Sequence, residues 1–190
     1  MGRKKTWREK LLDSKDLPKV VLLKENAQKH WKGNTMAIPS PMEVKQIMAG
    51  IPRGKLITIE GIRKRVARKH KADIGCPLTC GIFSWIVAHA AMEVAAEGKK
   101  KITPYWRTLK TGGELNPKYP GGIEEQKKRL ESEGQKVVQK GKKYIVENYE
   151  KNLLRVNLNV AKPLRERPGG DTGRHCREAA ACGGYFPKAL

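Results

Sequence analysis

One stretch of this sequence is apolar over a length that favours a buried helix. It reads CPLTCGIFSWIVAHAAMEVAAEG, with Pro77 and Thr79 marking its start and Gly98 its end. Apolar side chains cover most of its helical circumference, and no Lys or Arg occurs before Glu97. A helix that is apolar all round lies inside a domain, because no face of it suits water. We therefore expect the chain to fold around this segment.

The charge of the chain points to a polyanionic partner. Lys and Arg number 40 against 19 Asp and Glu, which gives a net charge of +21. Basic residues crowd both flanks of the apolar segment, from Arg63 to Lys71 and from Lys99 to Lys101. Each phosphate that such residues neutralise releases a condensed counterion, so nucleic acid is the expected partner. The alternative is a lysine-rich surface that only serves solubility.

Three features bear on where the protein works. We see no run of about 18 apolar residues, so we expect no membrane-spanning segment. The opening MGRKKTWREKLL lacks the apolar stretch of a secretory signal. The 4 cysteines, without such a signal, favour free thiols in a reducing compartment. We predict an intracellular protein, cytoplasmic and nucleoid-associated, that is monomeric and needs no cofactor.

The pattern of breakers and periodic segments divides the chain into four regions. We expect an N-terminal arm over residues 1–40, a compact unit over 41–135, a basic hairpin or loose extension over 136–162, and a disordered tail over 163–190. Within the unit, a helix after Thr58 and the apolar helix are joined by a short turn, with extended pieces on either side. This order predicts a mainly α protein with small β elements, of the winged helix-turn-helix type.

Local signals place the other elements of the unit. Ser40 is a plausible N-cap with Pro41 at the first helical position, and Gly50 ends that helix. Ile123 and Leu130 face inward from a later helix.

Two further segments carry a family resemblance. IPRGKLITIEGIRKRVA and TPYWRTLKTGGELNPKYPGGIEEQKKRLESEG resemble the DNA-binding domain of the methylated-DNA–protein cysteine methyltransferases, over roughly residues 41–135. That family shows a Pro-Cys-His-Arg-Val motif, an Asn-Tyr-x-Gly-Gly-like turn and a helix ending Glu-Gly. The resemblance implies a helix-turn-helix that binds the DNA minor groove and a damaged base flipped into a pocket. It also implies transfer of the alkyl group from the exocyclic oxygen of guanine to a cysteine.

The resemblance assigns the site residue by residue, with losses at its centre. Pro104 matches the family's proline, Tyr105 stands where the acceptor cysteine should be, and Trp106 replaces the proton-relaying histidine. Arg107 is retained, and Glu133 matches the glutamate that orients the histidine, although no histidine is present for it to hold. The turn that lines the base pocket corresponds to Tyr119, Gly121 and Gly122.

Other family positions have no match. The pocket asparagine would fall at Glu97 or Gly98, and the arginine finger near Leu78 or Thr79, neither of which can imitate it. The tyrosine that helps to rotate the nucleotide corresponds to Ile59. These losses weaken base flipping as well as catalysis.

Tyrosine at position 105 argues against alkyl transfer. A phenol with a pKa near 10 is at most about a thousandth ionised at pH 7. Arg107 could lower the pKa of Tyr105, but the indole nitrogen of Trp106 only donates and cannot serve as a base. The chain is thus similar to the alkyltransferase-like proteins, which lack the cysteine, bind alkylated DNA and mark it for nucleotide excision repair. Tyr105 and Trp106 would stack on the alkylated base. Alternatively, they would fill the base pocket that the resemblance implies and pack as part of the core.

The expected DNA contacts come mainly from the basic flanks. Besides Arg107 they are Arg63, Lys64, Arg68, Lys69, Thr79, Lys99, Lys100, Lys101 and Lys110. The expected partner is double-stranded DNA, including alkylated duplexes, and the resemblance adds nucleotide excision repair proteins as candidates. Neutralising Lys99 to Lys101 together is expected to flatten the salt dependence of DNA affinity.

Rival interpretations remain. An active enzyme could still transfer the alkyl group to Tyr105, Cys76 or Cys80, although small buried cysteines are the commoner case. His70 is the only near candidate to complete a metal site with them, so we predict no metal; His89 is expected in the core. Non-specific architectural or regulatory DNA binding and RNA or ribosome association are the other candidates.

Overall fold

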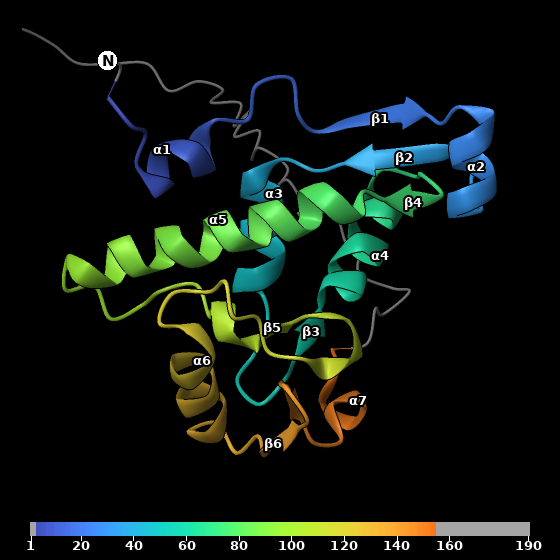
Figure 1. The fold of residues 1–190 in the computed structure, drawn as a ribbon. Helices are drawn as coiled ribbons and strands as arrows, with labels where there is room; N and C mark the ends of the chain where they lie inside the picture. Colours follow the sequence, from blue (N-terminus) through green and yellow to red (C-terminus); the bar gives the residue numbers. More distant parts are fainter. Residues whose placement is uncertain (1–2, 155–190) are drawn as a thin grey trace, which may run out of the picture. The chain divides into compact units, whose positions relative to one another are not determined.

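The computed structural model describes residues 3–154 of the chain (Figure 1). The tail predicted over 163–190 lies outside the described residues, as does the end of the region predicted over 136–162. The described part is mainly helical with small sheets, as expected. Its helices are α1 (Trp7–Leu12), α2 (Glu25–Trp31), α3 (Pro41–Ala49), α4 (Ile59–Lys69), α5 (Pro77–Ala96), α6 (Gly122–Glu131) and α7 (Tyr149–Asn152), with 3-10 turns η1 (Tyr105–Arg107) and η2 (Thr111–Gly113). Its strands are β1 (Lys19–Leu22), β2 (Thr35–Ile38), β3 (Ile57–Thr58), β4 (Ile74–Gly75), β5 (Thr108–Leu109), β6 (Val137–Lys140) and β7 (Lys143–Val146).

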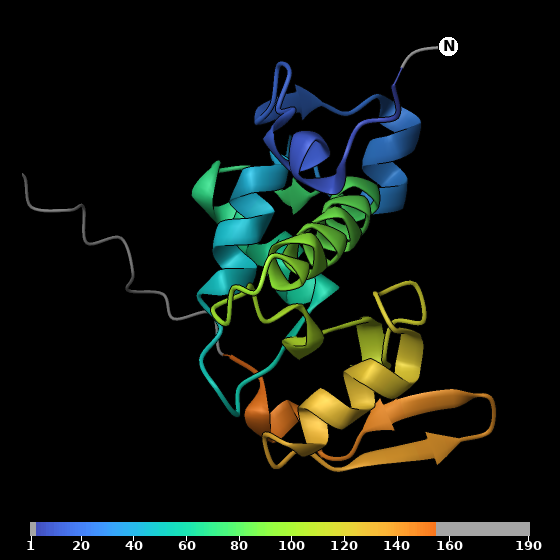
Figure 2. The same ribbon diagram turned by 90° about the vertical axis from the view of Figure 1, so that its left-hand side faces the viewer.

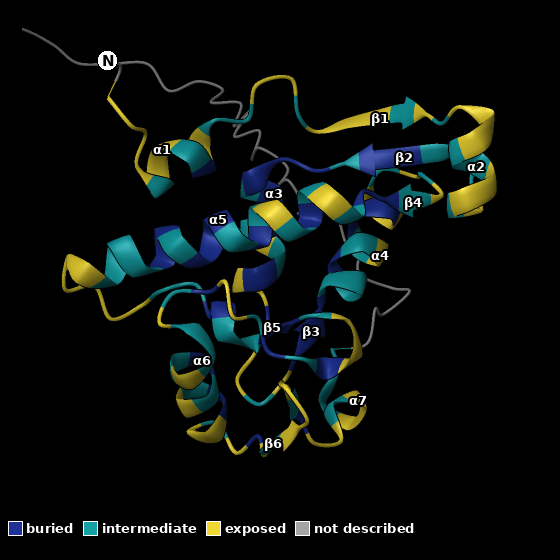
Figure 3. Ribbon diagram, viewed as in Figure 1, coloured by how far each residue is buried: buried dark blue, intermediate teal, exposed yellow. Residues whose placement is uncertain are grey.

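The apolar segment forms α5, and α1, α3 and α4 pack against it (Figures 1 and 3). Its buried residues are Cys80, Ser84, Ile86, Val87, Ala88, Ala90 and Ala91. By length and composition alone α5 could also cross a membrane, contrary to the expectation that no such run exists. The central helix of a folded core passes the same test, so this is weak evidence for a membrane span.

The predicted caps start α3 and α4. Ser40 Oγ accepts from the Glu43 amide at 3.2 Å, and Thr58 Oγ1 accepts from the Gly61 amide at 3.1 Å. Each side chain satisfies an amide that the first turn of a helix leaves without a backbone partner. These local bonds explain why the sequence alone fixes both helix starts.

The N-terminal segment is built into the fold. β1 pairs antiparallel with β2, and β2 pairs parallel with β4. In the sequence, β4 lies between α4 and α5. Glu93 of α5 accepts from the Trp7 and Arg8 amides at 2.9 and 3.0 Å, which caps α1 from outside its own sequence. Trp7 also stacks on His89, with ring centroids 4.4 Å apart. Residues expected as an arm therefore form part of the core.

Figure 2 shows α6 beside the β6–β7 hairpin, and both contribute to a second apolar cluster. Its buried members are Leu56, Leu109, Leu115, Leu130 and Val146. β3 and β5 pair in parallel across it, and β6 and β7 form an antiparallel hairpin in which Lys140 pairs with Lys143. Of the two alternatives for the segment after residue 135, the hairpin is the one that the structure contains.

Candidate functional site

Tyr105 is completely buried. Its exposed fraction is 0%, and its ring meets the rings of Trp106 and Tyr119 edge-on at centroid distances of 5.5 and 5.7 Å. The hydroxyl lies 3.4 Å from Pro120 O and 3.6 Å from Met92 Sδ. Pro104, also buried, precedes the 3-10 turn that directs Tyr105 inward. Tyr105 thus occupies the interior and is packed as core.

The surroundings of Tyr105 keep its phenol protonated. Burial raises the pKa of Tyr105 above its ordinary value, and the nearby Arg129 opposes this without reversing it. Arg107, which the sequence suggested as the activating cation, is held by Glu133 instead. Because the charged form is disfavoured, Tyr105 is a poor nucleophile in this environment.

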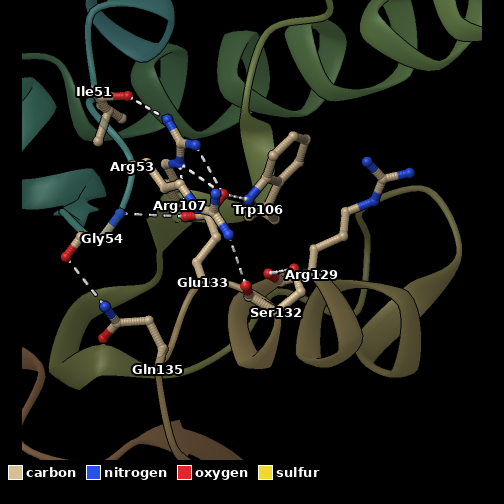
Figure 4. Close-up of polar contacts among 9 residues, drawn as sticks. All are labelled: Ile51, Arg53, Gly54, Trp106, Arg107, Arg129, Ser132, Glu133 and Gln135. Atoms are coloured by element: carbon tan, nitrogen blue, oxygen red, sulfur yellow. Dashed lines mark hydrogen bonds and ion pairs between the residues drawn. The ribbon is translucent and has the colours of Figure 1, made fainter. Parts of the chain in front are cut away.

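Glu133 is the centre of a buried polar cluster (Figure 4). The Trp106 indole donates to Glu133 Oε1 at 2.8 Å, and Arg107 donates Nη2 to Oε1 at 2.7 Å and Nε to Oε2 at 2.8 Å. Arg107 Nη1 donates to Ile51 O at 2.5 Å. With no histidine beside it, Glu133 holds the Trp106 indole and the Arg107 guanidinium instead.

Electrostatics favour the ionised form of Glu133. Burial alone raises the pKa of this carboxyl, but the donors of Arg107 and Trp106 outweigh it, and the net pKa is lowered. The side chains of Arg107 and Glu133 are 13% and 7% exposed, so the ion pair is shielded from solvent. Such a pair orders the site, because both charges would be costly without each other.

The same cluster ties the loop before β3 to the end of α6. Arg53 donates to Ser132 O and Gln135 donates to Gly54 O, each at 3.1 Å (Figure 4). These hydrogen bonds join parts of the chain that lie 79 and 81 positions apart in the sequence. The family-like segments are thereby fixed against each other.

Arg129 was missed by the sequence interpretation. Its guanidinium lies 4.8 Å from the Trp106 ring centroid and 5.8 Å from that of Tyr105. Its Nε donates to Glu125 at 2.6 Å, one turn earlier on α6. The helical spacing of Glu125 and Arg129 predicts their pairing, but nothing in the sequence indicates that the pair covers the two aromatic rings.

The turn before α6 contains two glycines with positive φ. Gly121 has φ 74° and caps α6, and a Cβ there would lie 2.5 Å from Glu125 Cβ. Gly122 follows with φ 66°. Tyr119 is 3% exposed, and burial raises its pKa to about 12. The turn therefore needs glycine, and it holds Tyr119 against Tyr105.

Gln126 is a second residue that the sequence did not reveal. It is completely buried and donates Nε2 to Trp106 O at 3.1 Å and to Thr108 O at 3.2 Å. Its Oε1 accepts from the Asn116 amide at 2.8 Å. One amide side chain thus joins η1, β5 and the loop before the glycine turn.

The predicted DNA-contacting residues do not form one cluster. Lys64, Lys69, Lys99 and Lys110 pair with Glu60, Glu43, Glu97 and Glu114, at 2.7, 3.0, 3.2 and 2.7 Å. Arg63 is half-buried, donates to Gly75 O at 3.0 Å and lies 5.6 Å from the Trp31 ring. Arg68, Lys100 and Lys101 are exposed, and the Thr79 hydroxyl is buried with no hydrogen-bond partner among the described residues. The groups near α4 and near Lys99 lie at opposite ends of α5, which spans about 30 Å.

The rival nucleophiles and ligands have structural roles. Cys80 is completely buried and burial raises its pKa to about 12; Cys76 is 9% exposed. His70 Nε2 lies 2.9 Å from Glu43 Oε1, so it pairs within the core rather than with the cysteines. Within residues 3–154, no group of three or more His, Cys, Asp or Glu could hold a metal ion.

Solved structures to which the chain is similar include two from S. pombe, whereas no protein-family model and no curated protein matches it. S. pombe Atl1 in complex with damaged DNA containing O6-carboxymethylguanine is similar with 21% identity, a TM-score of 0.45, and coverage of 60% of this chain and 94% of that one. S. pombe ATL in complex with DNA is similar at 22% identity and TM-score 0.44, with the same coverage of 60% and 94%. Atl1 is an alkyltransferase-like protein, the class that the sequence resembles.

Proposed function

We propose that this protein binds duplex DNA through a winged helix-turn-helix, recognises alkylated guanine, and transfers no alkyl group. The observation that carries the proposal is the state of position 105. A neutral, buried phenol stands there, and the adjacent indole is committed as a donor to Glu133.

The chemistry supports binding without transfer. Displacement at an alkyl carbon needs an anionic nucleophile and a group that removes its proton. Tyr105 has no hydrogen bond to a base, because the acceptors nearest its hydroxyl are Pro120 O and Met92 Sδ. Cys80 is unsuited as a substitute, since its burial holds the thiol in its protonated form.

The DNA interface is proposed at α4 and the amino-terminal half of α5. Leu78 and Ile82 lie one turn apart on α5 and are 69% and 42% exposed, whereas the other residues of this helix, up to its last, are buried or half-buried (Figure 3). Since no charged side chain occurs on this half of α5, its grip on phosphates must come from the exposed Lys64, Arg68 and Lys69 of α4. The two helices would then supply apolar and electrostatic contacts respectively.

Lesion reading is proposed at Trp106 and Arg129. The indole is fixed in orientation by Glu133, and the guanidinium lies over its ring. Stacking of an aromatic face on a base contributes about 1–3 kcal/mol of binding free energy. A neighbouring cation attracts the electron-rich edge of that base. Repair proteins that act on the bound lesion are the partners that this function requires.

A second candidate is duplex binding without lesion reading. It is favoured by the complete burial of Tyr105 between Trp106 and Tyr119, which leaves the old pocket filled. A base could enter only if these rings moved apart.

Fluorescence anisotropy at fixed salt separates the two candidates. The titrations compare duplexes that differ only in one guanine, plain or methylated on its exocyclic oxygen. A preference of about tenfold, equal to about 1.4 kcal/mol, supports lesion reading. Arg129→Gln should lower that preference, whereas Lys128→Gln, which removes the same charge from an exposed neighbour on α6, should not. Equal affinity for both duplexes would instead favour the second candidate.

A further inference from the structure

A groove lies between α1, α3, α5 and the segment 101–103, and neither Tyr105 nor Trp106 lines it. Its volume is about 240 Å³. Its apolar lining includes Leu11, Leu12, Val87, Ala90, Val94 and Ile102. Three cations, Arg8, Lys45 and Lys101, also line it. The groove therefore combines an apolar floor with a basic rim.

The walls of the groove are held in place. Thr6 and Glu9 form a capping box that starts α1, with the Thr6 amide donating to Glu9 Oε2 at 2.7 Å. Glu93 of α5 accepts from the Trp7 and Arg8 amides, and Trp7 meets the Trp85 ring at 4.7 Å. Because these bonds fix α1 on α5, the groove exists without a ligand.

Unbalanced positive charge remains on the rim. Arg8 pairs with Glu97, which also pairs with Lys99 at 3.2 Å. Lys45 and Lys101 make no ion pair within residues 3–154. Leu12, between the groove and solvent, is 68% exposed. The rim can thus contact both carboxylates and an apolar side chain of an occupant.

The groove and the proposed DNA interface use different faces of α5. Val87, Ala90, Ala91 and Val94 line the groove and lie about 80° to 180° around the helix from Ile82, at about 100° per residue. They are also one to three turns further along it. A ligand in the groove would leave Leu78 and Ile82 uncovered.

We propose that this groove binds an acidic, amphipathic helical segment of a partner protein. Val87, Ala90, Ala91 and Val94 form an apolar row along the α5 wall. Apolar side chains spaced one turn apart on a docked helix can pack against such a row. Carboxylates on that helix would meet Lys45 and Lys101. A duplex has no apolar side chain to fill the floor, and a second copy with the same +21 charge would be repelled. Lys101, expected among the DNA contacts, would then serve the protein partner.

The test uses the full chain and a fluorescein-labelled synthetic helical peptide of about 16 residues, or about four turns. The peptide has Leu at positions i, i+4 and i+7 and Glu on its other faces. A scrambled peptide of equal composition, with its Leu residues spread round the helix, is the first control. We expect the amphipathic peptide to bind at least about tenfold more tightly than the scrambled one.

Matched protein variants locate the binding. Lys45→Glu combined with Lys101→Glu should weaken peptide binding by at least about tenfold, and Lys140→Glu combined with Lys142→Glu by less than about twofold. The second pair makes the same charge change on the exposed hairpin. Thermal unfolding shows whether both variants remain folded.

Equal binding of both peptides, or equal weakening in both variants, would overturn the proposal. So would displacement of the peptide by dodecanoate at a lower concentration than by unlabelled peptide, which would assign the groove to a small anionic amphiphile. None of these outcomes depends on lesion reading.

Discussion

The Trp106 indole donates to Glu133 Oε1 at 2.8 Å, and the same carboxylate accepts from Arg107 through both of its oxygens. A carboxylate that orients a catalytic histidine in the resembled family here holds a side chain that can only donate. Neither donor, the indole nor the guanidinium, can take a proton from a nearby nucleophile.

Removing the charge of Glu133 should destabilise the fold. In Glu133→Gln the indole keeps an acceptor, but Arg107 loses its counter-ion in a site where it is 13% exposed. We expect a decrease of about 2 kcal/mol in the free energy of unfolding, measured with urea. Glu131→Gln, an exposed neighbour on α6, should change it by less than about 0.5 kcal/mol. Similar stabilities of the two variants would contradict a structural role for the ion pair.

The same residue should give stability a pH dependence on the acid side. The folded pKa of Glu133 is below its unfolded value of 4.5, so its contribution is present above that pH. It is lost as pH falls from 4.5 through the folded pKa, because the unfolded state then binds the extra proton. Denaturant unfolding at a series of pH values should show a shallower acid slope in Glu133→Gln than in the wild type. Parallel slopes would mean that Glu133 titrates alike in both states.

Introducing the cysteine and histidine that the family resemblance calls for should produce alkyl transfer. In Tyr105→Cys with Trp106→His, Glu133 can orient the new histidine, which can take the proton of the thiol. Intact mass after incubation with alkylated duplex should then rise by one alkyl group. Tyr105→Cys alone should gain no mass, since Trp106 supplies no base. Replacing buried Tyr105 opens a cavity that costs about 3 kcal/mol, so folding of both variants is checked by circular dichroism. A folded double variant with no added mass would count against the family-like geometry.

A carboxylate on the exposed face of α5 should weaken DNA binding without affecting folding. Leu78 is 69% exposed, so Leu78→Glu should leave the unfolding midpoint almost unchanged. It should lower duplex affinity by about tenfold, because a negative charge would approach phosphates. Leu22→Glu on β1, where the side chain is 81% exposed, is the matched control and should reduce affinity far less. An equal effect of both substitutions would indicate long-range charge alone.

The basic side of α4 should set the salt dependence of DNA binding. Neutralising Lys64, Arg68 and Lys69 with Gln should reduce the slope of log affinity against log salt by up to about 3, which is about 1 for each phosphate that the variant no longer neutralises. The salt titration is done on plain duplex, so lesion reading does not enter. An unchanged slope would remove α4 from the interface.

Local signals in the sequence predicted much of the secondary structure. Ser40 and Thr58 cap α3 and α4, and the apolar segment from Pro77 forms the helix α5, as expected, although Leu78 and Ile82 on it are exposed. Caps and periodicity act within a few residues, so they can be interpreted without knowing the rest of the fold. The absence of a cysteine at position 105 was equally visible.

Tertiary structure alone decided how those elements work together. Glu133 meets Trp106 and Arg107 across 27 and 26 positions, and Glu93 caps α1 from 86 positions away. Tyr105 could be judged core or pocket only once the rings around it were placed. The charge of Lys101 was evident in the sequence. Its position beside an apolar groove became known only from the folded structure. The sequence determined the helices and the missing nucleophile because those depend on neighbours in the chain. Which donors, acceptors and charges meet depends on packing between distant segments, and only the folded chain decides it.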